Sequence, residues 1–232
     1  MSPRKNTKKE ISPAVLLNSA VRTIATFNPK FNPNKGEVFS NELNVRGTAF
    51  WLKDYKILVT CSHVVNEILS LPLELAGLLV VGNHGQHKRA IVNMVDYQHD
   101  LAVLSLVNND GTPLGKEIID SESSAGLIIA KNYPNVGEPV AWAGYPLGSQ
   151  LLNHIQDPTY SEGVVGISKR EDGNRKNIQI SGVVVGGYSG SPVISKKEGH
   201  VLGILSNGPQ NSGIFMATSF EHIKAIAELA KS

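Results

Sequence analysis

Apolar and β-branched residues recur along this chain in short runs that are separated by turn-forming residues. Runs of this length and spacing are typical of the strands of a barrel or a sandwich, so they predict an all-β protein. The predicted strands cover the ranges Ala20–Phe27, Val45–Leu52, Lys56–Thr60, Gly77–Gly82, Ala90–Tyr97, Leu101–Val107, Glu138–Gly144, Tyr160–Ser168, Lys176–Val185, Ser191–Ser195, Val201–Ser206 and Gly213–Thr218.

Two segments interrupt this pattern, and two others predict helices. Asn28–Asn44 contains two Asn-Pro pairs and a glycine, which predicts a loop. The strand pattern also lapses over Asn108–Asn135, where we expect the link between two halves of the molecule. A short helix is predicted at Ser62–Ser70, with its first serine as the N-cap. After Ser219 apolar residues recur at helical spacing, which predicts an amphipathic helix at the end of the chain.

Composition and charge narrow the class of protein. The chain has 232 residues, of which 41% are hydrophobic and 18% are charged, as in ordinary soluble globular proteins. Its formal net charge of +2 gives little reason to expect a nucleic-acid partner, and residues 1–14 are predicted to form a disordered basic tail. The apolar run Pro13–Val21 lacks the features of a signal peptide, and no run approaches the roughly 20 residues of a membrane span. Cys61 is the only cysteine, so no intramolecular disulfide can form and a reducing, cytoplasmic location is expected.

One glycine-rich stretch carries the strongest chemical signal. Gly186–Val193 reads G-G-Y-S-G-S-P-V and lies between apolar runs. Because glycine adopts backbone conformations that other residues avoid, a tight and unusual loop is expected there. Such a loop can expose the Ser189 hydroxyl while the N–H groups of Gly187 and Ser189 turn toward one point, as in an oxyanion hole beside a nucleophile. A plain glycine-rich hairpin explains the same segment, so a base and an acid must be sought elsewhere.

A candidate base and a candidate acid stand beside two buried-looking strands. His63 follows such a strand in L-V-T-C-S-H-V-V, although a structural histidine would also fit there. Asp100 opens the apolar run D-L-A-V-L-S-L, where a buried carboxylate needs a partner. Asp96 and His99 compete for these roles, but neither stands directly before the apolar run.

These motifs together resemble one protein family. G-T-A-F-W-L, I-L-V-T-C-S-H-V-V, H-D-L-A-V-L and G-Y-S-G-S-P-V follow one another as in the trypsin-like (chymotrypsin-fold) serine proteases. The stretch V-A-W-A-G-Y-P-L-G is similar to a strand of the bacterial Deg-like enzymes, and the glutamyl endopeptidases are the other similar branch. The resemblance covers about residues 15–230 and does not include the PDZ module that Deg-like enzymes add.

The resemblance implies a fold. Two packed six-stranded antiparallel β-barrels of the chymotrypsin type are expected, with a C-terminal α-helix. The first barrel would span 15–110 and the second 136–218, joined by a linker over 111–135 and followed by the helix over 219–232.

The resemblance also implies roles for individual residues. His63, Asp100 and Ser189 would form the catalytic triad in the cleft between the barrels, and the amides of Gly187 and Ser189 would form the oxyanion hole. Ser206 matches a position that hydrogen-bonds the catalytic aspartate, so it is expected to support the triad.

The resemblance also implies a pocket for the substrate residue before the scissile bond. The segments that would form this pocket contain no charged residue. Cleavage after apolar residues is therefore expected, since an unpaired buried substrate charge costs several kcal/mol. The implied pocket residues are Val183, Val184, Asn207, Gly208, Gly213 and Phe215. No cofactor and no metal is expected, because no His/Cys cluster has ligand spacing.

The residue directly before the proposed nucleophile is Tyr188. In the digestive enzymes of the family this position is an aspartate, which pairs with the new N-terminus after zymogen cleavage. Activation of that kind is therefore expected to be absent. Two hypotheses remain: a serine endopeptidase that acts on protein or peptide substrates, and a catalytically silent relative that binds a protein partner through the same cleft. An endopeptidase that needs a protein activator lies between them. No membrane partner is expected.

Overall fold

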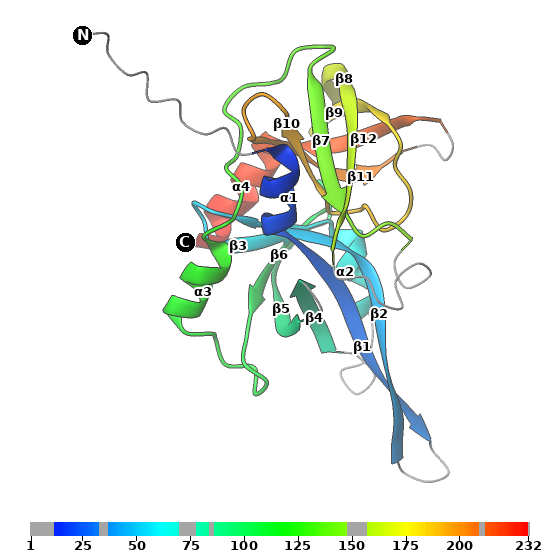
Figure 1. Ribbon diagram of the computed structural model, residues 1–232, viewed down its shortest axis with the longest axis vertical. Helices are drawn as coiled ribbons and strands as arrows, with labels where there is room; N and C mark the ends of the chain where they lie inside the picture. Colours follow the sequence, from blue (N-terminus) through cyan, green and yellow to red (C-terminus); the bar gives the residue numbers. More distant parts are fainter. Residues whose placement is uncertain are drawn as a thin grey trace, which may run out of the picture.

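The computed structural model describes residues 12–32, 37–69, 78–83, 86–147, 157–208 and 212–231. Twelve strands in this part of the chain close into two antiparallel barrels of six strands each, which lie one above the other in Figure 1 and confirm the expected fold. The strands are β1 (Val21–Asn32), β2 (Glu37–Leu52), β3 (Ile57–Thr60), β4 (Leu78–Asn83), β5 (Gln86–Asp96), β6 (Leu101–Leu106), β7 (Pro139–Gly144), β8 (Thr159–Asp172), β9 (Arg175–Gly182), β10 (Pro192–Ser195), β11 (Val201–Asn207) and β12 (Ile214–Ser219). The helices are α1 (Pro13–Ala20), α2 (Ser62–Leu69), α3 (Lys116–Ser123) and α4 (Phe220–Lys231).

Each barrel encloses alternate side chains of its strands. In the first barrel the order is β1-β2-β3-β6-β5-β4, and in the second it is β10-β11-β12-β9-β8-β7. Phe50, Leu58 and Leu104 are fully buried in the first core, which also includes residues of α1 and α4. Trp142 and Ile180 belong to the second core. Burying one such side chain contributes about 1.5–3 kcal/mol, so the two cores stabilise the barrels that carry the loops of the site.

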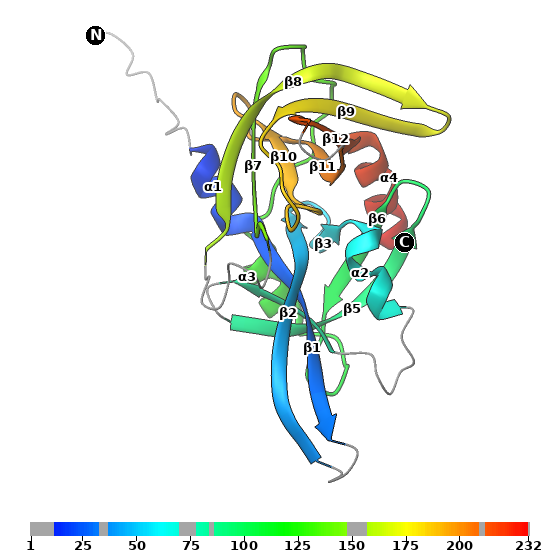
Figure 2. The same ribbon diagram turned by 90° about the vertical axis from the view of Figure 1, so that its right-hand side faces the viewer.

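The first two strands form a long hairpin that projects from the first barrel (Figures 1 and 2). The predicted loop over Asn28–Asn44 was therefore wrong, because the ladder continues through Pro29 opposite Asn41 to the end of β1. Within the described residues β1 pairs with β4 from Thr23 to Phe27, so Pro29 lies beyond the part of β1 that has a second described neighbour. A residue without an N–H breaks no hydrogen bond on that open side.

Two helices were missed in segments that the sequence assigned to a tail and a linker. The predicted tail ends too late, because α1 begins at Pro13; Ser12 caps it, with its Oγ accepting a hydrogen bond from the N–H of Val15. Residues 1–11 lie outside the described residues. In the linker α3 forms, and the chain after it bonds to both barrels: the N–H of Leu127 donates to Trp51 and the N–H of Val201 donates to Ile128.

The two helices that the sequence predicted are present. α4 is amphipathic as expected, with Ile223, Ile226 and Ala227 buried against the barrels. α2 begins at Ser62, but the hydroxyl of this serine bonds to a carboxylate of another loop and does not cap the helix. In the described ranges, no helix combines the length and the apolar character that a membrane span requires.

Candidate active site

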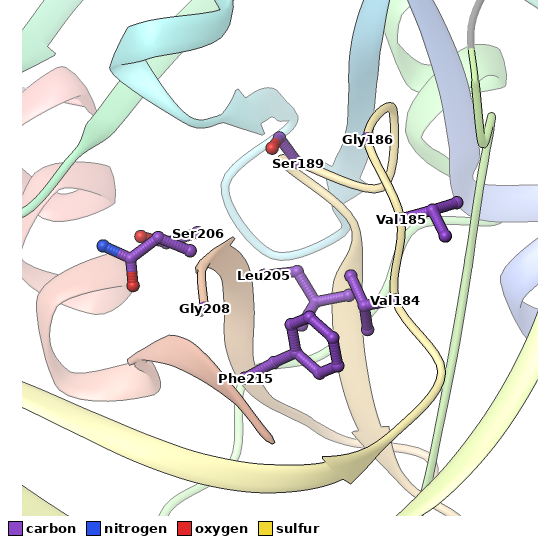
Figure 3. Close-up of a pocket in the computed structure, with 9 residues that line it drawn as sticks. Val184, Val185, Gly186, Ser189, Leu205, Ser206, Gly208 and Phe215 are labelled. Atoms are coloured by element: carbon purple, nitrogen blue, oxygen red, sulfur yellow. The ribbon is translucent and has the colours of Figure 1, made fainter. Parts of the chain in front are cut away.

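Two glycines give the loop between β9 and β10 its shape. Gly187 and Gly190 have φ values of +93° and +86°, in the left-handed region that favours glycine. A Cβ at Gly187 would lie 2.1 Å from the carbonyl oxygen of Tyr145, and one at Gly190 would lie 2.0 Å from that of Thr48. Only glycine fits these two positions, and between them Ser189 lies at the rim of a pocket (Figure 3).

The hydrogen bonds of this loop fix the direction of two peptide groups. The carbonyl of Gly186 accepts a hydrogen bond of 2.6 Å from the N–H of Leu147, and the carbonyl of Tyr188 accepts one of 2.9 Å from the N–H of Ser191. Because the C=O and N–H of one planar peptide point in opposite directions, the N–H groups of Gly187 and Ser189 point away from those partners. Neither N–H donates a hydrogen bond to any other described residue.

Residues of the first barrel hold the same loop in place. The N–H of Thr48 in β2 donates to the carbonyl of Ser189 at 2.9 Å, and its hydroxyl donates to the carbonyl of Gly187 at 2.9 Å. The Thr48 hydroxyl also accepts a hydrogen bond of 3.2 Å from the N–H of Tyr145. Thr48 is fully buried, so these bonds are shielded from water.

His63 and Asp100 form a hydrogen-bonded pair. The Nδ1 atom of His63 lies 2.7 Å from Oδ2 of Asp100, while the backbone N–H of His63 and the hydroxyl of Ser62 both donate to Oδ1, at 2.9 and 2.8 Å. The side chain of Asp100 is 15% exposed and that of His63 is 48% exposed, so the imidazole is open to a ligand. Burial acts to raise the pKa of Asp100, but the hydrogen bonds from His63 and Ser62 outweigh it and hold that pKa below its ordinary value.

The competing pair is occupied elsewhere. Nδ1 of His99 lies 2.6 Å from Oδ2 of Asp96, and the ring of His99 stacks on that of His222 in α4 with 3.8 Å between the centroids. Asp96 therefore faces His99 and not His63.

A pocket of about 330 Å³ opens beside Ser189, and a second hollow adjoins it on the side of His63 and Asp100. Ser206 and Asn207 line both, which places Ser189 and the His63–Asp100 pair around one continuous depression. No hydrogen bond joins Ser189 to His63 among the described residues, a common condition in proteases without a bound substrate.

The geometry of this depression agrees with the sequence comparison. The model of the trypsin-like peptidase domain matches residues 47–204. The chain belongs to the trypsin-like serine protease family.

Two curated proteases are similar to this chain in sequence. The peroxisomal leader peptide-processing protease of Mus musculus is 28% identical over 68% of this chain, and the serine protease Do-like HtrA of Lactococcus lactis is 31% identical over 65%. The matches cover 25% and 33% of those two proteins, so the chain spans a quarter to a third of their length. Among solved structures, the active form of the Rv3671c protease from M. tuberculosis has the same fold, with a TM-score of 0.62 and 19% identity over 94% of this chain and 83% of that one.

Some expected positions of this trypsin-like domain lie elsewhere in the structure. Val184, Asn207, Gly208 and Phe215 line the pocket, but Val183 and Gly213 do not. The predicted strand over Lys176–Val185 ends at Gly182, and Val183, the next residue, is 74% exposed.

Three further pocket residues, Val185, Gly186 and Leu205, were not assigned to the site from the sequence, although each adjoins a predicted site residue. Ser206 makes no hydrogen bond to Asp100 among the described residues; Ser62 makes the bond that was expected from it. The motif C-S-H contains that serine, but its spacing alone does not show that its hydroxyl turns toward Asp100.

One group of three possible metal ligands occurs in the described part of the chain. Atoms of Cys61, His63 and Asp100 lie within 4.8 Å of one another. Burial raises the pKa of the Cys61 thiol well above its ordinary value, and the thiol donates to the carbonyl of Leu205 at 3.1 Å. A metal ligand must be a thiolate, so these residues fit a metal poorly.

Proposed function

We propose that this domain hydrolyses peptide bonds with Ser189 as nucleophile, His63 as general base and Asp100 as the group that orients the histidine. The observation that supports this most directly is the pair of unbonded N–H groups, of Gly187 and Ser189, beside the Ser189 hydroxyl. The C=O group of each of these two peptides is hydrogen-bonded, which fixes the direction of the N–H group before any substrate binds. Preorganised donors of this kind are worth about 3 kcal/mol each in the transition state.

The steps follow from the positions of the side chains. Nε2 of His63 takes the proton of Ser189 as its Oγ attacks the scissile carbonyl, and the developing oxyanion accepts hydrogen bonds from the two N–H groups. Asp100 keeps the proton on Nδ1 and stabilises the imidazolium. The imidazolium then protonates the leaving amine, and a water molecule, deprotonated by the same histidine, releases the acyl group from Ser189.

The pocket supports cleavage after apolar residues. Val184, Leu205 and Phe215 give it apolar walls, and all nine residues that line it, each within the described ranges, are uncharged. Figure 3 shows the ring of Phe215 close to Val184 and Leu205 below Ser189. A charged side chain would lose its hydration there without gaining a partner, which favours Val, Leu, Met or Phe before the cut.

Active-site labelling and mutation test this proposal. The wild-type domain should react with a fluorophosphonate probe and cleave an unfolded protein after apolar residues. Ser189→Ala and His63→Ala should each lower kcat by about 10⁶, and Asp100→Asn by about 10⁴ through the wrong histidine tautomer. Circular dichroism must show that each variant is folded.

Three results would contradict the proposal: a folded Ser189→Ala protein with wild-type turnover, a wild-type protein that binds peptides but never reacts with the probe, or a cleavage profile dominated by Arg, Lys or Glu before the cut. The second result would favour a silent binding protein.

A further inference from the structure

The hollow beside the pocket, with a volume of about 420 Å³, contains a charge that the proposed reaction does not use. Its lining includes the His63–Asp100 pair together with Tyr97 and Arg175. We name it the arginine groove. Because Ser206 and Asn207 border both the pocket and this groove, a peptide with one side chain in the pocket would bring a neighbouring side chain to the groove.

Arg175 is fixed by its backbone position and by one hydrogen bond. It is the first residue of β9, directly after the turn from β8, and Nε of its side chain donates to the carbonyl of Gln98 in the first barrel. No described residue bonds to the two terminal nitrogens of the guanidinium, which carry their N–H donors in a planar fork.

Within the described ranges, the acids near the groove are hydrogen-bonded to other residues or form no ion pair with Arg175. Both oxygens of Asp100 accept hydrogen bonds from Ser62 and His63, and Asp96 is bonded to His99. Asp172 stands opposite Arg175 in the β8–β9 ladder, but among the described residues it forms no ion pair with it. The guanidinium of Arg175 is therefore the unpaired charge of the groove as the structure describes it.

We propose that Arg175 determines specificity by binding the carboxylate of an Asp or Glu residue that neighbours the apolar residue in the bound peptide. A guanidinium fork matches a carboxylate in geometry and charge, and Lys or Arg at the same substrate position would be repelled. The inference rests on the proposed function and deepens it, because it adds an acidic requirement to the apolar one.

Peptide pairs that differ at one position test the inference. Peptides with Leu at the cleavage position carry Glu, Gln or Lys at each neighbouring position in turn, and kcat/KM is measured for each. Glu should exceed Gln by about tenfold at one of these positions, and the advantage should shrink at 0.5 M salt. Arg175→Glu should reverse the order so that Lys is preferred, and Arg175→Gln, which can still donate to the carbonyl of Gln98, should abolish the discrimination.

Arg170→Glu is the matched control. Arg170 lies in the same hairpin, bonded to Gln179, and does not line the groove. This variant makes the same change in net charge and should keep the preference for Glu. Equal effects of the two charge reversals, or a wild-type protein that treats Glu and Gln alike, would overturn the inference.

Binding separates this inference from the proposed function. The same peptides are titrated against the Ser189→Ala protein, and their Kd values are read by fluorescence anisotropy. A tighter Kd for Glu than for Gln that requires Arg175 would uphold the groove even if no peptide were hydrolysed, whereas equal Kd values would reject it even if hydrolysis were efficient.

Discussion

Replacing Thr48 with valine should damage both the stability and the catalytic loop of this protein. Valine has nearly the shape of threonine, so the change removes the hydroxyl and leaves the packing almost unaltered. Two groups then lose their partner: the carbonyl of Gly187, 2.9 Å from the hydroxyl, and the N–H of Tyr145, 3.2 Å from it. The backbone bond from Thr48 to Ser189 remains.

The expected magnitude follows from the burial of those two groups. Tyr145 is 1% exposed, so its N–H cannot turn to water and its loss of a partner costs about 1–3 kcal/mol. Gly187 is half-buried, and its carbonyl can be partly hydrated in the variant. We therefore expect a total loss of about 2–3 kcal/mol in the free energy of unfolding, which lowers Tm by roughly 5–10 °C in a protein of this size.

The effect on catalysis should be seen in kcat. Without the bond to the Gly187 carbonyl, the loop segment that carries the N–H groups of Gly187 and Ser189 is held less firmly. A misplacement of about 1 Å in a catalytic group can cost about 100-fold in rate. Thermal unfolding gives Tm, and hydrolysis of one apolar peptide gives kcat and KM.

Thr48→Ser and Thr23→Val are the controls for this change. Serine keeps the hydroxyl of Thr48, so kcat should stay near the wild-type value. Thr23 is a buried threonine of the first barrel whose hydroxyl donates to Gly82, so its replacement should lower Tm without lowering kcat. The reasoning is refuted if Thr48→Val and Thr48→Ser have the same Tm and the same kcat.

Two further predictions concern a buried tyrosine and a histidine of α4. The hydroxyl of Tyr188 lies 2.9 Å from that of Ser161, so Tyr188→Phe and Ser161→Ala should each cost about 1 kcal/mol of stability. Urea unfolding of the double variant should show little further loss, and additive losses would show that the bond is not shared. Burial and the positive charges of His99 and Lys176 lower the pKa of His222 to about 4, although Asp96 and Glu221 oppose them. Unfolded His222 takes up a proton near pH 6.5 while the folded residue stays neutral, so stability should fall as the pH drops from about 6.5 to about 4. His222→Phe keeps an aromatic ring beside His99 and should make this fall shallower; equal slopes in the two proteins would exclude the histidine as its source.

Local pattern was enough to predict the strands, and the family resemblance implied the two barrels, but neither predicted the segments that leave the barrels. The strands of both barrels alternate or are wholly apolar because they face a core, and that signal survives without knowledge of the fold. A loop was wrongly predicted at Pro29, because the sequence does not show how many neighbouring strands β1 has at that residue. The cap Ser12 and the proline after it are a regular start for α1, but the helix is short and basic residues precede it, which favoured a tail.

The candidate site divides in the same way. His63, Asp100 and Ser189 could be predicted because each stands in a motif whose sequence order is informative. The roles of Ser62 and Leu147 could not be predicted, since they depend on the local backbone conformation. The hydroxyl of Ser62 donates to Asp100, and the N–H of Leu147 donates to the carbonyl of Gly186. Leu147 has a φ of +59°, an uncommon value for this residue type. Val183 was assigned to the pocket by counting back from the nucleophile, and the end of β9 at Gly182 makes that count misleading.

The turn that carries Asp100 belongs to the first barrel, yet the second barrel and α4 hold it. Asp100 has a φ of +56°, a strained value that persists only where the surroundings impose it. The carbonyl of His99 accepts a hydrogen bond of 3.1 Å from the hydroxyl of Thr218 in β12, and its ring stacks on His222.

Thr48 links the barrels in the opposite direction: it belongs to the first barrel and its hydrogen bonds hold the loop of the second barrel that carries Ser189. Each barrel thus positions a proposed catalytic group of the other, and neither His63–Asp100 nor Ser189 is fully fixed by its own barrel. Docking of the two barrels and assembly of the proposed triad are therefore one structural event, and a change that loosens their interface should lower kcat before it unfolds either barrel.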